Sequence, residues 1–208
     1  MADEPATGSP FAVDPTPDDG ARRSGERPWD ESERPSGPPP DPERRYSAAE
    51  QAAGRHLIDV HDGLRAELSR LRVALDEVAA GESDPAALRS FFNRMTMRQN
   101  NWTLGAFCQS YCRAVTGHHT LEDSSVFPHL GQADPRLQAV LDRLGEEHET
   151  IAEILERIDA ALVALVAGEA GAMDRVADAV DLIADAMASH FSYEERELIE
   201  PLARLGFH

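Results

Sequence analysis

Apolar residues recur at alternating steps of three and four in four long segments of the chain, which is the spacing of one face of an α-helix. The apolar stripes run over residues 57–75, 104–122, 137–165 and 176–194. Hardly any segment shows the strict alternation of apolar and polar residues that is typical of a β-strand. We therefore predict an all-α fold, an up-down-up-down four-helix bundle in which each helix turns its stripe toward a common core.

Capping and turn signals set the ends of the predicted helices. Ser47 and Glu50 have the spacing of a capping box at the start of the first helix, and Gly81 suits its end. Two Asp-Pro pairs place an N-cap before a proline at the first helical position, which predicts the start of a short extra helix and of the third long helix. The predicted helices span about residues 47–80, 84–95, 101–127, 134–167 and, after Gly171, up to about 201.

The composition changes sharply near Tyr46. Residues 1–46 hold 10 of the 14 prolines, eleven acidic and six basic side chains, and few large apolar ones. Such a segment buries too little apolar surface to offset the entropy lost on ordering, so we predict a disordered N-terminal arm over 1–46. The bundle domain then occupies residues 47–208. The sequence identifies no protein partner for the arm.

Charge and hydropathy exclude several classes of partner. The net charge of −18 argues against nonspecific nucleic-acid binding and against binding to anionic membrane surfaces. No apolar run approaches the length of a membrane span. The opening residues have neither the basic nor the apolar region of a secretory signal, so we expect a cytoplasmic protein.

Two His-x-x-x-Glu motifs interrupt the second and fourth apolar stripes. His118 and Glu122 lie four residues apart, as do His190 and Glu194, and each pair occupies stripe positions where an apolar residue is expected. This spacing places both side chains of a pair on one helix face, one turn apart. Because burying such polar groups is costly unless they are paired, a shared metal ion is the favoured interpretation.

The first and third stripes each contain one histidine, His61 and His148. In an up-down bundle both lie roughly 20 Å from one end, and His118 and His190 lie roughly 15 Å from the same end, at about 1.5 Å per residue. The four imidazoles therefore share about one layer, which scattered core histidines have no reason to do. This agreement favours a metal centre over a purely structural bundle.

The donor types restrict the metal. Mixed imidazole and carboxylate ligands suit iron, manganese or zinc, whereas the absence of thiolates disfavours a structural zinc site. Six protein ligands are too many for one tetrahedral ion and too few to saturate two octahedral ones. Two metal ions bridged by the carboxylates, with open positions for a small molecule, fit the set best.

Other polar residues near the stripes are interpreted as supporting ones. His119 lies about 100° from the stripe, so we expect it beside the ligands or at the rim of the site. Asp123 and Glu195 follow the stripe glutamates and are expected to hydrogen-bond the ligands. Packing is favoured over a redox role for Tyr111. Residues expected away from the centre are His56, His129 and His208 at the surface and Cys108 and Cys112 in the core.

Four segments carry a resemblance to hemerythrin-like, HHE cation-binding domains: DVHDGLRAEL, HHTLEDSSVFPHL, EEHETI and HFSYEERELIEPL, within residues 47–205. The resemblance implies an up-down four-helix bundle with a non-haem di-iron centre, so two iron ions are expected, ahead of manganese or zinc. The ligands that it implies are His61, His118, Glu122, His148, His190 and Glu194.

Two positions depart from the oxygen-carrying members of that family. Carriers place a second histidine four residues after the third-helix ligand, where this chain has Ala152, and an aspartate where it has Glu195. The chain is therefore similar to bacterial H-HxxxE-H-HxxxE variants. Losing one imidazole opens a coordination position, which disfavours reversible oxygen storage.

Two function classes stay open at this point. In the first, the di-iron centre binds or reacts with a small molecule such as O₂, NO or peroxide. In the second, the domain senses or binds iron or oxygen without turnover, and the N-terminal arm is an output segment or a tether. The sequence does not decide whether the protein is an enzyme.

Overall fold

The structure, a computed structural model, describes residues 13–79 and 114–206. Three long helices dominate these residues: α1 (Ala52–Ala79), α5 (Gln138–Val166) and α6 (Ala172–Leu205). Residues 114–121 are helical and continue into a π-helical turn, η2 (Glu122–Val126), and then into α4 (Phe127–Ala133). Short 3-10 turns are η1 (Glu31–Glu33) and η3 (Pro135–Leu137). The described part of the chain contains no strand, which confirms the all-α prediction.

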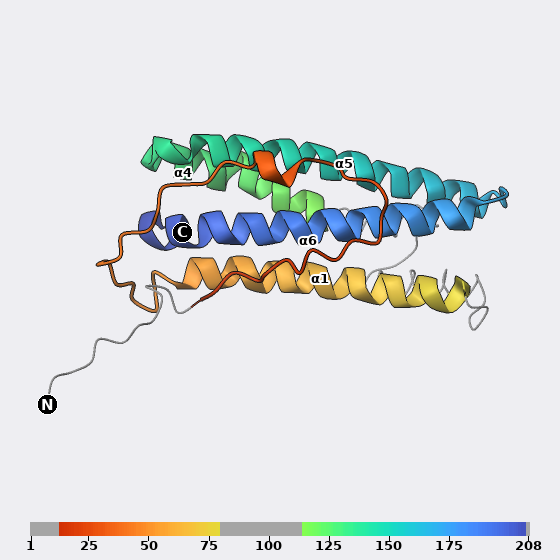
Figure 1. The fold of residues 1–208 in the computed structure, drawn as a ribbon, viewed down its shortest axis with the longest axis horizontal. Helices are drawn as coiled ribbons and strands as arrows, with labels where there is room; N and C mark the ends of the chain where they lie inside the picture. The colour runs from red at the N-terminus through yellow and green to blue at the C-terminus, as the bar shows by residue number, and fades with distance from the viewer. Residues whose placement is uncertain (1–12, 80–113, 207–208) are drawn as a thin grey trace, which may run out of the picture.

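α6 is the central element and packs against both α1 and α5 (Figure 1). Gly54 lets α1 approach α6 closely, because a Cβ at that position would lie 3.0 Å from Ile199 Cγ2. The predicted short helix over 84–95 and the start of the predicted helix over 101–127 lie outside the described residues. The up-down order of all four long helices therefore stays a prediction.

Local signals explain most helix ends. The capping box is present, with the Ser47 backbone N–H donating to Glu50 Oε2 at 2.8 Å and the Glu50 N–H donating to Ser47 Oγ at 3.3 Å. A turn follows, so α1 begins at Ala52, later than predicted. Gly171, with φ of +68°, precedes the first turn of α6 as predicted. α6 continues through Pro201 to Leu205. Proline lacks a backbone N–H, so one helical hydrogen bond is lost. The last turn is still closed, because the Gly206 N–H donates to the Leu202 carbonyl.

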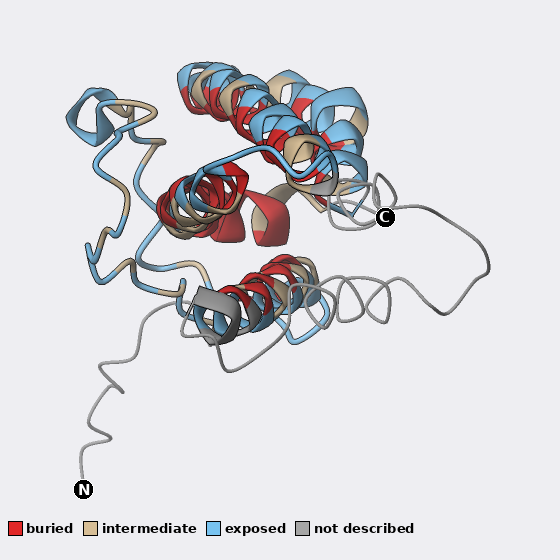
Figure 2. Ribbon diagram, turned by 90° about the vertical axis from the view of Figure 1, so that its right-hand side faces the viewer, coloured by how far each residue is buried: buried red, intermediate tan, exposed pale blue. Residues whose placement is uncertain are grey.

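The buried apolar side chains form two clusters, one on each side of a polar layer. One cluster extends from Leu64 along α1 and includes Ile151 and Met187. The other contains Leu57, Leu144 and residues of α4. Figure 2 shows the buried faces of the helices turned toward one another, with the exposed faces outward. The buried polar residues between the clusters include His61, His119, Glu122, His148, His190 and Glu194.

The disordered arm is not confirmed for residues 13–46. From residue 13 this segment runs along α6, turns, and runs back along α5 before α1 begins (Figure 1). The Thr16 N–H donates to Glu195 Oε2 at 2.7 Å, and the Gly37 N–H donates to Glu197 Oε2 at 2.8 Å. The segment docks through backbone N–H groups and arginines, and Trp29 packs against the apolar cluster that begins at Leu64. Its many prolines reduce the entropy lost on docking. We call residues 13–46 the strap.

Among the described residues, no helix is long and apolar enough to span a membrane.

Candidate metal centre

The six side chains implied as ligands converge in the polar layer between the two apolar clusters. His61, His190 and Glu194 have no exposed surface, and Glu122 and His148 are also buried. They come from four helical segments: His61 from α1, His118 and Glu122 from residues 114–126, His148 from α5, and His190 and Glu194 from α6. The structure therefore brings together all six predicted residues.

The first group of potential ligand atoms belongs to His61, His118, Glu122 and Glu194, whose donor atoms lie within 4.8 Å of one another. His61 Nε2 lies 3.0 Å from His118 Nε2 and 3.5 Å from Glu194 Oε2. His118 Nε2 lies 3.2 Å from Glu122 Oε1. Imidazole nitrogens and carboxylate oxygens thus point at one common position, which is the geometry needed to hold a cation.

A second group consists of His119, His148 and His190, again with donor atoms within 4.8 Å. The His119 and His148 rings are stacked, with centroids 3.8 Å apart and planes inclined by 7°. His119 is buried, so it is neither at the rim of the site nor exposed. The sequence placed it outside the ligand set because it lies off the apolar stripe. Its four-residue spacing to Asp123 was the one signal that it had a role.

The two glutamates lie between these groups. Glu122 directs Oε1 to His118 in the first group and Oε2 to His148 in the second, with the latter contact at 3.7 Å. Glu194 Oε2 lies 3.5 Å from both His61 Nε2 and His190 Nε2. Each carboxylate therefore faces one histidine from each group, an arrangement suited to bridging two cations.

Several buried donor atoms of the centre have no hydrogen-bond partner among the described residues. They are His119 Nε2, Glu122 Oε2, His148 Nε2, His190 Nε2 and both carboxylate oxygens of Glu194. Buried polar atoms are nearly always paired, since each unpaired one costs about 1–3 kcal/mol. Because these atoms converge from different helices, cations in the two groups would satisfy all of them together, so the residues present fit a metal centre.

A ring of carboxylates holds the other nitrogen of three of the imidazoles. Asp123 Oδ1 lies 2.8 Å from His148 Nδ1, and Glu195 Oε1 lies 2.8 Å from His61 Nδ1, both as the sequence predicted. Glu147 Oε2 lies 3.0 Å from His190 Nδ1. A carboxylate at Nδ1 places the proton there and leaves Nε2 with its lone pair toward the centre.

Sequence reasoning missed Glu147. It precedes the ligand candidate His148 on α5 but contacts His190 on α6. Its role depends on how α5 and α6 pack side by side, which no spacing within one helix reveals. Its position next to a stripe histidine is the only signal in the sequence.

The environment keeps three imidazoles neutral. Burial lowers the pKa of His118 to about 4, and the neighbouring imidazoles add to that shift. Burial also lowers the pKa of His119 and of His148, although Asp123 partly offsets the shift at His148. The neutral imidazole is the form that binds a metal ion. These three side chains are therefore prepared for ligation.

The two glutamates between the groups differ in their electrostatics. Burial, together with the negative charge of Glu194, raises the pKa of Glu122 well above its ordinary value. Burial alone would raise the pKa of Glu194, but the neighbouring imidazoles of His190 and His61 hold it well below its ordinary range. In the metal-free protein the centre thus favours the ionised form of Glu194 and the protonated form of Glu122, and a bound cation would displace the proton of Glu122.

The π-helical turn η2 starts at Glu122, and its backbone closes with the Phe127 N–H donating to the Glu122 carbonyl. Within it, two adjacent acids reach the same imidazole, Glu122 at His148 Nε2 and Asp123 at His148 Nδ1. Single π-helical turns inside α-helices frequently occur at functional sites. The i, i+4 pattern in the sequence does not reveal this turn.

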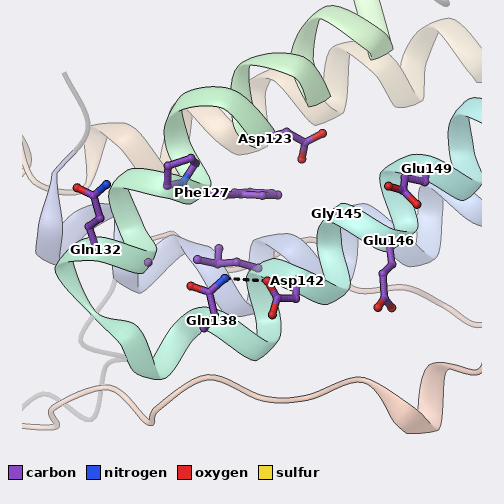
Figure 3. A pocket seen from close by; sticks show the side chains of 11 residues that line it. Asp123, Phe127, Gln132, Gln138, Asp142, Gly145, Glu146 and Glu149 are labelled. Atoms are coloured by element: carbon purple, nitrogen blue, oxygen red, sulfur yellow. Dashed lines mark hydrogen bonds between the residues drawn. The ribbon is translucent and has the colours of Figure 1, made fainter.

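A groove of about 710 Å³ lies between α4 and α5 beside the centre. Asp123 and Phe127 line it from one side, and Asp142, Glu146 and Glu149 from the other (Figure 3). Asp123 hydrogen-bonds His148, and the Phe127 ring stacks on the His148 ring with centroids 5.5 Å apart. These two residues therefore separate the groove from the second histidine group.

Comparison with known families agrees with this geometry. The model of the family described as Hemerythrin HHE cation binding domain matches residues 52–203, which include every candidate ligand in both groups. No curated protein and no solved structure gives a significant match to the chain. The family match covers well over half of the 208 residues. The chain therefore belongs to the hemerythrin HHE cation-binding domain family.

Proposed function

We propose that this protein is a non-haem di-iron protein whose centre binds or reacts with a small molecule such as O₂, NO or peroxide. The observation that carries the proposal is the position of Glu122 and Glu194, each of which faces a histidine from both groups. Bridging carboxylates between two sets of imidazoles are suited to a pair of iron ions, with manganese or zinc as weaker fits.

The ligand assignment follows from the two groups. His61 and His118 would hold one ion, and His148 and His190 the other, with Glu122 and Glu194 between them. His119 would add a third imidazole to the second ion, a role that the sequence had not assigned to it. Counted this way, the first ion has four protein donors and the second five.

These counts leave coordination positions open. Six-coordinate iron would have more free positions at the first ion than at the second. Bound iron would supply those positions and the redox capacity for reaction with small oxidants. The first group, around His61 and His118, is therefore the proposed place for the small molecule.

The protein's own contribution is to orient donors and exclude water. Phe191 stacks on the His61 ring with centroids 4.0 Å apart, and Phe127 covers His148. The apolar clusters close the polar layer on both sides. A dry, rigid surrounding of this kind strengthens electrostatic interactions and limits bulk-water access.

The second candidate is an iron- or oxygen-sensing module without turnover. It is supported by the strap, which contacts α6 beside the centre through Thr16 and Glu195 and so offers a route from the site to the surface. In either case we propose a protein with no nucleic-acid or membrane partner, because its net charge of −18 disfavours binding to anionic surfaces.

Metal analysis and turnover assays test the proposal together. Protein loaded with ⁵⁷Fe should bind close to two ions per chain and give the Mössbauer spectrum of a coupled pair. Consumption of peroxide or NO above the rate of free iron would favour the reactive function, whereas tight iron binding without consumption would favour the sensing one. Binding of fewer than about one ion per chain by the well-folded protein would contradict both.

A further inference from the structure

Two buried glutamates connect the histidines of the centre to the strap. Glu195 accepts from His61 Nδ1 through Oε1 at 2.8 Å and from the Thr16 backbone N–H through Oε2 at 2.7 Å. Glu147 contacts His190 Nδ1 at 3.0 Å and the guanidinium of Arg34 at 2.8 Å. Each carboxylate therefore has the centre on one side and residues 13–46 on the other.

Arg34 is the most firmly held side chain of this connection. Its Nε and Nη2 atoms donate to the two oxygens of Glu147, each at 2.8 Å, which is the paired geometry of the strongest arginine–carboxylate contacts. Its guanidinium lies 4.6 Å from the centre of the Tyr193 ring, and its side chain is only 7% exposed. An arginine that belongs to the strap is thus buried within the bundle.

Each of the two glutamates also has an arginine from the bundle itself. Arg143 lies 3.1 Å from Glu147 Oε1, and Arg65 lies 2.9 Å from Glu195 Oε1. The strap therefore supplies one of the three partner residues named for each carboxylate. Removing the strap would take hydrogen-bond donors away from both glutamates, so their orientation toward His61 and His190 would become less defined.

The strap has further anchors that fix its register on α6. The Arg23 and Ser24 N–H groups both donate to Asp185 Oδ2 at 2.8 Å, and Tyr193 donates its hydroxyl to the Pro35 carbonyl at 2.8 Å. These contacts lie on either side of Arg34 along the chain. These anchors hold Arg34 opposite Glu147, so the pairing of the two side chains is fixed by the register of the strap.

From these contacts we propose that residues 13–46 support the metal centre by orienting its histidines. The strap positions His61 through Glu195 and His190 through Glu147, and Arg34 is its principal positioning residue. This inference rests on the proposed metal centre and adds a means of controlling it, because docking of the strap and binding of metal favour each other. The two effects are thermodynamically linked. If the docked strap increases metal affinity by a given factor, bound metal favours docking of the strap by the same factor.

The first test measures metal affinity in full-length variants. Arg34→Gln removes the paired contact, and Arg45→Ala is the matched control, since Arg45 is an exposed strap arginine bonded only to nearby carbonyls. Anaerobic iron(II) titration against a competing chelator should show about tenfold weaker binding for Arg34→Gln, the low end of the range for residues that support ligands. Arg45→Ala should match the wild type, and Arg34→Lys should recover part of the loss.

A second pair of variants avoids the risk that Arg34→Gln folds poorly. Thr16→Pro deletes the N–H that donates to Glu195, while Thr16→Ala keeps it and removes only the hydroxyl, which Arg65 contacts at 3.3 Å. We expect weaker iron binding for Thr16→Pro than for Thr16→Ala. The visible spectrum of the cobalt(II)-loaded protein should shift in the proline variant alone, which a purely structural role for the strap would not produce.

Proteolysis tests the reverse effect, which is the influence of bound metal on docking of the strap. Trypsin should cut the wild-type strap after Arg23, an exposed arginine followed by Ser24, and iron(II) should slow this cleavage. In Arg34→Gln the protection by iron should shrink. Wild-type affinity and an unchanged cobalt spectrum in both Arg34→Gln and Thr16→Pro would overturn the role of the strap alone. Failure of the wild-type protein to bind iron would instead overturn the proposed function, and this inference with it.

Discussion

His119 stacks face to face on His148, with ring centroids 3.8 Å apart, and directs an unpartnered Nε2 into the second histidine group. His119 comes from the segment 114–121 and His148 from α5, so the contact joins two helices at the level of the centre. A buried histidine with a free nitrogen beside two others is better explained as a ligand than as packing.

His119→Ala should therefore reduce iron content from near two to near one ion per chain, or weaken the second ion at least tenfold. His56→Ala is the matched control, because His56 is exposed on α1 and outside both groups. Metal analysis after dialysis against a weak chelator measures the difference. Equal metal content in the two variants would show that His119 only packs.

The opposite pKa shifts of the two bridging glutamates predict opposite effects of removing their charge. Glu122 retains its proton in the metal-free protein, so Glu122→Gln should leave metal-free stability nearly unchanged and weaken metal binding strongly. Glu194 is ionised between His61 and His190, so Glu194→Gln breaks a buried ion pair, at a cost of about 3 kcal/mol without metal. Urea unfolding of both variants with and without metal checks this. Equal metal-free stabilities would contradict the assignment of the proton to Glu122.

Removing the strap should destabilise the bundle. Deleting residues 1–45 takes away Arg34, the N–H groups that bind Glu195 and Asp185, and several buried pairings. A loss of roughly 3 kcal/mol would lower the thermal midpoint by about 10 °C in a domain of this size. Circular dichroism melts of the full chain and the deletion measure it. An unchanged midpoint would restore the interpretation of this segment as a passive arm.

Part of this centre could be predicted from sequence, and the reasons are local. Helical periodicity fixes which face a residue occupies, and the rise per residue fixes its depth. The sequence alone therefore predicts one layer for His61, His118, His148 and His190. Glu122 and Glu194 followed from the same four-residue spacing. Each of these inferences concerns one helix at a time.

The missed features all depend on contacts between segments. His119 lies off the apolar stripe and reaches the centre because the segment 114–121 turns two adjacent faces toward α5 and α6. Glu147 acts on a histidine of the neighbouring helix. The strap was predicted to be disordered because composition counts apolar side chains, whereas this segment docks through N–H groups and Arg34 onto buried carboxylates. Contacts between different segments leave no periodic pattern in the sequence from which they could be predicted.

Acid should reveal the contribution of Asp134, which is remote from the centre. Its carboxylate caps η3 through the Arg136 N–H and pairs with the side chains of Arg136 and Arg204, and these contacts hold its pKa below the ordinary value of 3.8. A depressed folded pKa gives stability that is present above the unfolded value and is lost as pH falls through the folded one. Asparagine keeps a capping oxygen but loses the charge that pairs with Arg136 and Arg204, so Asp134→Asn should lower stability by about 1 kcal/mol or less at pH 6.

The difference between wild type and Asp134→Asn should shrink as the pH falls below about 4. Denaturant unfolding of metal-free protein at pH 6, 4 and 3 measures it without interference from metal release. A difference that stays constant over this range would mean that the carboxylate charge contributes nothing.

The last prediction concerns oxygen, and it depends on where the fifth imidazole comes from. The resemblance to oxygen carriers placed that imidazole at position 152, where this chain has Ala152, and the missing ligand argued against reversible oxygen binding. In the structure Ala152 is exposed, whereas His119 is buried against His148. His119 thus joins the second group from a different helix, where it would supply a bound ion with the imidazole that position 152 lacks.

We therefore expect the reduced, iron-loaded His119→Ala protein to be oxidised by O₂ roughly tenfold faster than the wild type, because the variant opens a position at the second ion. Azide titration of the oxidised forms should detect one additional binding position in the variant. Ala152→His should change neither rate nor azide stoichiometry, since a side chain at that position faces solvent. Stopped-flow absorbance under defined oxygen concentrations separates these outcomes. If Ala152→His slowed oxidation while His119→Ala had no effect, the missing imidazole would belong to α5 after all, and His119 would not be a ligand.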